Sequence, residues 1–333
     1  MSKDSVLLTR SPEAIARRGK VNLLWFAIKA AISLGLIAFI FWKLDFAAVW
    51  TRLKQLSLAL ILTVVLMFVV QTCIAAWRWW VIMRHHHLDI RFSTTVRIGF
   101  IGAFFNQLLP SSIGGDVARA WYVYRNGYGK GIPVVTVLSD RIYGMLLLVC
   151  LATLFFPILV YYSVSDQALI MVAVLIAVAL SALTAAFWLD CLPAWLQRWA
   201  LIRRLGFLSE ATRAVTADRR AILLVIGLSF LVHLITILAT LLLLATIAPQ
   251  HKLLLCAALV PMITLIAMVP ISIAGWGVRE SIMIYGLGLA NVPTEAALIV
   301  SIMVGLSLAA VGLLGGVTWL TENERAKSRE STG

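Results

Sequence analysis

Long runs of apolar residues, separated by short polar segments, dominate the pattern along this chain of 333 residues. A helix needs roughly 20 consecutive apolar residues to cross the hydrocarbon core of a bilayer. Six stretches meet that length, and we predict that each one is a full membrane span. They are residues 21–42, 56–83, 143–162, 168–189, 221–247 and 295–320. The pattern therefore predicts an all-α polytopic membrane protein.

A ten-residue phrase interrupts this pattern twice, at positions 160 residues apart. The copies read PSSIGGDVAR at 110–119 and PISIAGWGVR at 270–279, with Pro, Ser, Ile, Gly and Arg at matching offsets. Non-helical backbone at membrane depth is tolerated only where protein or water satisfies its polar groups. Paired interruptions at corresponding places in two halves of a membrane protein point to a transport site.

Short apolar arms flank each copy of the phrase. The arms of the first copy are 98–109 and 116–124, and the arms of the second copy are 253–269 and 276–289. Twelve helical residues rise only about 18 Å, a little over half of the ~30 Å core. We therefore predict that the first pair of arms forms a re-entrant helical hairpin. The longer second pair either turns at mid-depth or traverses the membrane.

The Lys and Arg residues are distributed unevenly between the two sides of the predicted spans. With a cytoplasmic N-terminus, 20 of the 28 lie in cytoplasmic segments, four lie outside, and four fall within spans or hairpins. Membrane proteins carry such an excess of positive charge in their cytoplasmic loops, so both termini are predicted to be cytoplasmic. Counting the first hairpin as a single crossing would put the basic loop 190–220 outside, and we reject that alternative.

These assignments divide the chain into two membrane repeats between short cytoplasmic tails. Each repeat reads span, span, hairpin, span, and the two repeats begin on opposite sides of the membrane. That arrangement is an inverted-topology repeat, which many alternating-access transporters use. The predicted parts are the N-tail 1–20, the first repeat 21–162 with its hairpin at about 98–124, the second repeat 168–320 with its hairpin at about 253–289, and the C-tail 321–333.

The residues at the two hairpin tips have the chemistry of an anion site. A helix that restarts after a glycine presents N–H groups of partial positive charge, and serine hydroxyls can donate beside them. Arg119 and Arg279 carry planar guanidinium groups suited to phosphate or carboxylate. A simple kink is the alternative for either tip, and an interfacial position is the alternative for Arg119. The remaining predicted contact residues at the tips are Ser111, Ser112, Gly114, Gly115, Ser272 and Gly275.

Polar residues on either side of the tips extend the candidate site. Asn106 and Gln107 precede the first tip, and a polar pair at this depth predicts a water-filled cavity. Asp116 follows the first tip, where the role of a helix N-cap is the alternative. Glu280 lies next to Arg279, which predicts a buried ion pair or a binding site.

Three further charged residues fall near the predicted ends of spans. Asp140 and Arg141 are expected to open the third span at its cytoplasmic end, either as part of the site or as a local ion pair. Arg78 lies within the aromatic cluster 77–80 close to the end of the second span. We interpret that cluster as an interfacial aromatic belt with a cation that reaches toward the headgroups.

The composition agrees with a membrane protein and excludes several other classes. Apolar residues make up 62% of the chain and charged residues 13%, with a mean hydropathy of +0.97. The net charge of +13 lies mainly in loops between spans, so nucleic acid is not an expected partner. Four separate cysteines without C-x-x-C spacing predict neither a disulfide framework nor a zinc site. The consecutive histidines 85–87 point in different directions on a helix, and we expect no metal and no cofactor.

The chain resembles the lysylphosphatidylglycerol synthase transmembrane region family, also called flippase-like. The residues that carry the resemblance are the two extended phrases, FNQLLPSSIGGD at 105–116 and PISIAGWGVRE at 270–280, together with Arg119 and the Asp140-Arg141 pair. The resemblance extends over about residues 20–320, with Asp140 where the family more often has Glu and Ala274 in place of a frequent Gly. It implies a bacterial inner-membrane protein that moves lipids or lipid-linked headgroups between leaflets. The larger synthases continue into a soluble aminoacyl-transfer domain. This chain ends 13 residues after Leu320, so we expect neither that domain nor an enzymatic activity.

The sequence thus predicts a lipid flippase or translocase with an anionic headgroup site between the two tips. Its cargo would be an anionic phospholipid, glycolipid or lipid-linked carrier, moved by alternating access. The expected partners are membrane lipids and a separately encoded lipid-modifying enzyme. One alternative is a non-transporting scaffold for such an enzyme, in which the tips would be dry and apolar. The other is an intramembrane lipid-modifying enzyme, although the chain has no HExxH or GxSxG motif and no clustered acid/His set.

Overall fold

The computed structural model describes residues 46–108, 113–129, 131–188, 209, 212–268 and 277–330. Within these ranges the chain is helical and forms no strand, in agreement with the predicted all-α class. The helices are α2 (Phe46–Leu53), α3 (Leu58–His85), α4 (Phe92–Leu108), α5 (Gly114–Arg125), α6 (Gly131–Tyr161), α7 (Asp166–Trp188), α10 (Arg219–Ile247), α11 (Leu253–Ala267), α12 (Val278–Gly288) and α13 (Thr294–Glu330).

Five of the described helices are long and apolar enough to cross a membrane, namely α3, α6, α7, α10 and α13. They coincide with five of the six predicted spans. The sixth predicted span, 21–42, lies outside the described residues, as do residues 109–112 and 269–276 at the predicted hairpin tips. The chain is therefore a multi-pass helical membrane protein.

Two helices begin earlier than the apolar pattern predicts. The third span was expected from residue 143, but α6 begins at Gly131, with Pro133 in its first turn. Proline is tolerated there because the first N–H groups of a helix have no partner within the helix. The first hairpin arm was expected from residue 98, but α4 begins at Phe92 and has 17 residues. That length corresponds to about 26 Å, so this arm is longer than predicted.

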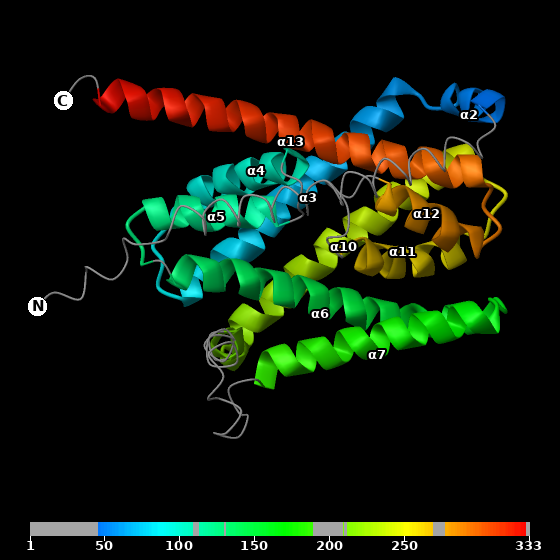
Figure 1. Cartoon of the computed structure of the whole chain (residues 1–333), viewed down its shortest axis with the longest axis horizontal. Helices are drawn as coiled ribbons and strands as arrows, with labels where there is room; N and C mark the ends of the chain where they lie inside the picture. Colours follow the sequence, from blue (N-terminus) through cyan, green and yellow to red (C-terminus); the bar gives the residue numbers. More distant parts are fainter. Residues whose placement is uncertain are drawn as a thin grey trace, which may run out of the picture.

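The helix contacts of the first half match those of the second half when α3, α4, α5 and α6 are paired in order with α10, α11, α12 and α13. In the centre, α3 packs against α10. The arm α4 packs against α5 and against α13, while the arm α11 packs against α12 and against α6. Every helix pair among α3–α6 and α10–α13 that packs extensively has a corresponding pair in which the helices of the other half take the same places. The pair α4 and α5 lies toward one end of the long axis and the pair α11 and α12 toward the other (Figure 1).

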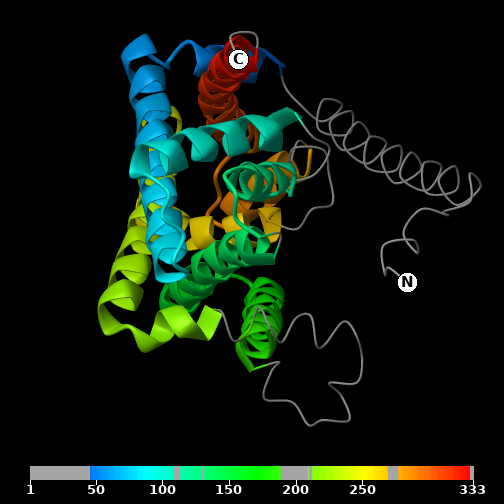
Figure 2. The same cartoon turned by 90° about the vertical axis from the view of Figure 1, so that its left-hand side faces the viewer.

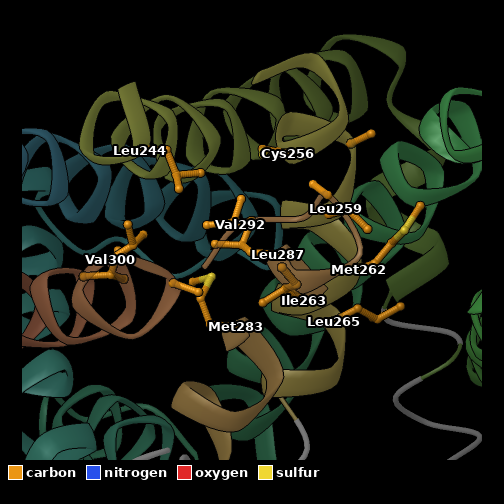
Figure 3. Close-up of a cluster of buried hydrophobic side chains, with 14 of the residues drawn as sticks. Leu244, Cys256, Leu259, Met262, Ile263, Leu265, Met283, Leu287, Val292 and Val300 are labelled. Atoms are coloured by element: carbon orange, nitrogen blue, oxygen red, sulfur yellow. The ribbon is translucent and has the colours of Figure 1, made fainter. Parts of the chain in front are cut away.

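The largest core cluster joins α3 and α6 of the first half to α7, α10, α11, α12 and α13 of the second half. Around α11, the side chains of Leu259 and Ile263 lie close to Met283 and Leu287 of α12 (Figure 3). Figure 2 shows α3 and α10 along one side of the molecule, with α4 and α5 reaching across it. Lipid is as apolar as these side chains, so close packing rather than exclusion from water holds membrane helices together.

Glycines bring α13 close to α4. A Cβ atom added at Gly315 would overlap the backbone carbonyl of Phe100, and one added at Gly316 would lie 2.9 Å from the Phe104 ring. Small residues allow the backbones of membrane helices to approach in this way. The contact joins α4 of the first half to α13, the last helix of the second half.

We expect Gly315→Ala to destabilise the protein by about 1–3 kcal/mol, because its methyl group would force α13 away from the α4 backbone. The matched control is Gly227→Ala on α10, where an added Cβ atom has nothing within 4 Å. That substitution should leave stability unchanged or raise it slightly through helix propensity. Thermal unfolding of the detergent-solubilised protein measures both changes, and equal melting temperatures for the two variants would contradict the packing argument.

Candidate functional site

A carboxylate with two guanidinium partners lies inside the helix bundle. Asp140 of α6 is only 3% exposed. It accepts a hydrogen bond from Arg78 Nε at 2.7 Å and another from Arg119 Nη2 at 2.9 Å. A buried charge is tolerated when it is paired and hydrogen-bonded, so this contact joins α3, α5 and α6 through one side chain.

The ion pairs continue to a second carboxylate. Asp116 accepts a hydrogen bond from Arg141 Nε at 2.6 Å and lies 3.5 Å from Arg119 Nη1. Arg119 therefore lies between Asp116 and Asp140, and its guanidinium group also sits 4.1 Å from the centre of the Trp79 ring. We call the five residues Arg78, Asp116, Arg119, Asp140 and Arg141 the ion-pair cluster.

Local helix geometry explains why neighbouring residues have different partners. Consecutive residues of an α-helix point about 100° apart, so Asp140 and Arg141 face different neighbours. Asp116 is the third residue of α5, where a negative charge is favoured by the positive end of the helix dipole. Arg119 lies one turn further along the same helix, on the same face as Asp116.

The first arm holds the start of α5 in place. The Asn106 side chain accepts a hydrogen bond at 2.8 Å from the Gly115 N–H group. A Cβ atom at Gly115 would overlap the backbone carbonyl of Gly102, so only glycine permits this close crossing of α4 and α5. The expectation that Asp116 could be an N-cap is wrong, because α5 has Ile113 at that position, without a side-chain cap.

The second half contains a smaller arrangement around Glu280 on α12. Its Oε1 atom accepts hydrogen bonds from Arg279 Nη2 at 2.7 Å and from Ser301 Oγ at 3.3 Å. Its Oε2 atom accepts one at 2.6 Å from the N–H group of Gly277, which has a φ of 84°. The predicted buried pair of Arg279 and Glu280 is thus confirmed, and the carboxylate also fastens the start of α12.

Each of the three most buried guanidinium groups in the described part of the chain lies against a glycine on a neighbouring helix. Arg119 lies against Gly102, Arg78 against Gly144, and Arg279 against Gly305. An added Cβ atom at any of these glycines would come within about 3.1 Å of the arginine side chain. The glycines therefore provide the space in which the guanidinium groups lie between helices. Sequence reasoning did not identify them, because a glycine within an apolar helix gives no sign of what it faces.

A cavity of about 360 Å³ lies between the two halves of the protein. Among the described residues, the charged ones in its lining are Arg141 and Arg279, one from each half. Helices α3, α4, α10 and α11 contribute uncharged polar side chains to the same wall. These polar lining residues are Gln71, Thr72, Asn106, Gln107, Thr236, Thr240 and Thr264.

The predicted site residues fall into three groups. Those that line the cavity are Asn106, Gln107, Arg141 and Arg279. Those that lie behind its wall, in ion pairs or at close helix crossings, are Gly115, Asp116, Arg119, Asp140 and Glu280; Gly114 is buried at the start of α5. Those outside the described residues are Ser111, Ser112, Ser272 and Gly275.

Two interpretations of charged residues near span ends are wrong. Arg78 is 7% exposed and bonds to Asp140 and to Ser229 Oγ, so it does not reach toward lipid headgroups. The neighbouring Trp79 is fully buried, so this part of the cluster is no aromatic belt. Asp140 does not open a helix either, because α6 begins nine residues earlier and places Asp140 about 14 Å along its axis.

The described residues include no group of three or more His, Cys, Asp or Glu side chains that could hold a metal ion. Of the three consecutive histidines, His85 ends α3 and its Nε2 atom lies 2.8 Å from the Ala214 carbonyl oxygen. The charged chemistry of this part of the chain is therefore that of guanidinium groups and carboxylates.

The family profile described as "Lysylphosphatidylglycerol synthase TM region" matches residues 26–316. The chain belongs to this family. None of the curated proteins matches it. The matched range includes both copies of the repeated phrase, the ion-pair cluster and every residue that lines the cavity, so membership in the lysylphosphatidylglycerol synthase TM region family applies to the whole candidate site.

We expect Asp140→Asn to cost about 3–5 kcal/mol of stability, because it leaves two buried guanidinium groups without their shared counter-charge. The same substitution at Asp89 is the matched control. Asp89 pairs with Arg84 at the exposed surface, so its loss should have little effect. Thermal unfolding in detergent measures the difference. If Asp140→Asn and Asp89→Asn melted at the same temperature, Asp140 would not be the charged centre of the fold.

Proposed function

We propose that this protein is a lipid translocase, or flippase, of the bacterial inner membrane. Its cargo is an anionic phospholipid, glycolipid or lipid-linked carrier, which it moves between leaflets. The observation that carries the proposal is the cavity between the two halves, whose charged lining residues are the guanidinium groups of Arg141 and Arg279. Arginine at membrane depth that faces an internal cavity marks a substrate pathway.

The proposed mechanism is alternating access by an inverted-topology repeat. The exchange pattern of helix contacts supports it, since α3, α4, α5 and α6 make the contacts that α10, α11, α12 and α13 make. The two pairs of hairpin arms also lie toward opposite ends of the molecule (Figure 1). Rocking of one half against the other would open the cavity first to one leaflet and then to the other. In this proposal six spans and two re-entrant hairpins cross or enter the membrane, with both termini cytoplasmic.

The roles of the arginines differ within this proposal. Arg141 and Arg279 contact the phosphate, since both line the cavity. Arg119 acts from behind the wall, because its guanidinium group is held by Asp116, Asp140 and the Trp79 ring. It is a positioning residue that keeps Asp116, and through it Arg141, in place.

The scaffold alternative is less well supported. A scaffold needs no polar space at the meeting point of its halves, and dry apolar tips would favour that role. The cavity instead has threonine hydroxyls and amide side chains in its wall together with the two arginines. Polar residues inside a membrane protein lower its stability. A substrate pathway accounts for their presence better than a scaffold does.

We expect Arg141→Gln and Arg279→Gln each to slow lipid translocation about tenfold or more, since a hydrogen bond to a charged group is worth about 1.5–3 kcal/mol. The assay uses proteoliposomes with fluorescent phosphatidylglycerol and a quencher that reaches only the outer leaflet. Arg84→Gln is the control, because Arg84 lies in an exposed ion pair away from the cavity.

Thermal unfolding of each variant separates a loss of transport from a loss of fold. Wild-type protein that moves lipid no faster than protein-free liposomes would contradict the proposed function. Equal rates for folded wild type, Arg141→Gln and Arg279→Gln would contradict the assignment of the site.

A further inference from the structure

A second pocket lies where three interhelical loops meet. The loops join α6 to α7, α10 to α11, and α12 to α13, and they lie toward the same end of the molecule as α11 and α12 (Figure 1). The pocket has a volume of about 450 Å³, within the range of ligand sites, and shares no lining residue with the cavity between the halves. We call it the loop pocket. Polar side chains from all three loops line it, among them Ser163, Ser165, Gln250, His251, Lys252 and Asn291.

The loop pocket has a cation in its lining. Lys252 is exposed, and its Nζ atom lies 4.7 Å from the centre of the Tyr162 ring. An ammonium group has three donors, so contact with the face of one ring leaves donors for an anion. Among the described residues, the lining includes neither Asp nor Glu, and Asp166 at the start of α7 lies outside it. The charge in the lining therefore favours an anionic ligand.

Ser163 occupies a position where the end of a helix usually has glycine. Its N–H group donates to the Val160 carbonyl at 3.0 Å, and the next N–H group, that of Val164, donates to the Leu159 carbonyl at 3.1 Å. This is the Schellman pattern, whose left-handed residue is most often glycine. Here that residue is Ser163, with a φ of 53°. The turn does not explain a serine at this position, whereas a hydroxyl donor in the lining of the loop pocket does.

His251 holds two walls of the loop pocket together. Its Nε2 atom lies 2.8 Å from the Asn291 carbonyl oxygen, and its Nδ1 atom lies 3.2 Å from the Ala248 carbonyl oxygen. These contacts join the loop between α10 and α11 to the loop between α12 and α13. Because Lys252 follows directly, they also fix the backbone that carries the ammonium group.

Two tyrosines place the loop pocket at the level of the lipid headgroups. Tyr161 ends the membrane-spanning helix α6 and is 81% exposed, and its ring centre lies 5.2 Å from that of Tyr162. Tyrosines at the end of a span lie at the interface between membrane and water. In the proposed topology this end of α6 faces the outer side. The anions that surround a protein at this level are the phosphate groups of lipids and soluble phosphate esters.

We propose that the loop pocket binds a phosphate group at the outer surface of the membrane, with Lys252 as its counter-charge and Ser163 and Ser165 as hydroxyl donors. The phosphate belongs to an outer-leaflet lipid or to a soluble phosphate ester, which offer the same chemistry. The inference goes beyond the proposed function, because it assigns a second site that does not depend on movement of lipid. Helix α11 connects the two sites, since Leu255 lines the loop pocket and Thr264 lines the cavity between the halves.

Titration of the full-length protein with phosphatidylglycerol in a neutral detergent tests the proposal, with native mass spectrometry measuring the bound lipid. We expect Lys252→Gln to weaken binding at one site about tenfold, the effect of losing a hydrogen bond to a charged group. Lys252→Arg keeps the charge and should restore most of the affinity. Lys54→Gln is the matched control, because Lys54 also lies over an aromatic ring, 5.5 Å from the centre of Trp50, and is outside the loop pocket. Equal affinities for Lys252→Gln and Lys54→Gln would overturn the proposal.

Two further probes identify the source of the phosphate. Diacylglycerol has the acyl chains without the phosphate, and we expect it to bind equally to wild type and Lys252→Gln; a loss of diacylglycerol binding in the variant would overturn the phosphate assignment. Displacement of the Lys252-dependent lipid by glycerol 3-phosphate at similar concentration would assign the site to a soluble phosphate ester. No displacement would assign it to a lipid headgroup. Binding of phosphate here by a protein that moves no lipid would contradict the proposed function alone.

The variant Ser163→Gly separates a role in binding from a role in folding. Glycine adopts a positive φ without strain, so thermal stability should stay the same or rise slightly. Binding of phosphatidylglycerol should weaken about fivefold through the loss of one hydrogen bond. His87→Gly is the control, because His87 has a φ of 59° in the same pattern at the end of α3 and lies outside the loop pocket. If Ser163→Gly bound the lipid as tightly as His87→Gly, the Ser163 hydroxyl would have no part in the site.

Discussion

The ion pairs of Asp140 are the contact on which the arrangement of the first half depends. A carboxylate at this depth must be neutralised, and the guanidinium groups of Arg78 and Arg119 do so from α3 and α5. Because Arg119 also reaches Asp116, the charge of Asp140 indirectly fixes Arg141 on the cavity wall. One buried charge thus determines where α5 lies and which cation faces the space between the halves.

The arginine of each copy of the repeated phrase is paired with a carboxylate, but the carboxylate lies in a different place in each copy. In the first half the arginine is held by a carboxylate on a neighbouring helix, which draws Arg119 behind the wall. In the second half Arg279 is held by the adjacent Glu280, so its guanidinium group remains at the cavity. Equivalent positions in sequence therefore have unequal roles. The cavity receives its second cation from Arg141, a residue outside the phrase.

Glycines have two different structural roles in this helix bundle, and the sequence alone does not show which glycine has which role. Gly115 and Gly315 bring helix backbones together, while Gly144 and Gly305 make space for guanidinium groups. These glycines bring α5 and α13 close to α4, α3 close to α6, and α12 close to α13. Small residues thus replace the hydrophobic effect as the basis of packing between these helices. The same closeness confines the cavity to a volume of about 360 Å³, within the range of ligand pockets.

The apolar pattern by itself determined the class of protein, the five described spans and the location of both pairs of arms. It could do so because the thickness of a bilayer dictates the length of a helix that crosses it. It could not determine the start of α6 at Gly131 or the burial of Arg78, since a polar residue near the end of an apolar run looks the same whether it faces lipid headgroups or a carboxylate on another helix. The sequence identified Arg119 and Arg279 of the two phrases, and also Asp140 and Arg141, as candidate site residues. It did not identify the residues with which they form ion pairs. Those pairs join residues up to 62 positions apart, so only the tertiary structure decided which charges are neutralised in the wall and which face the cavity.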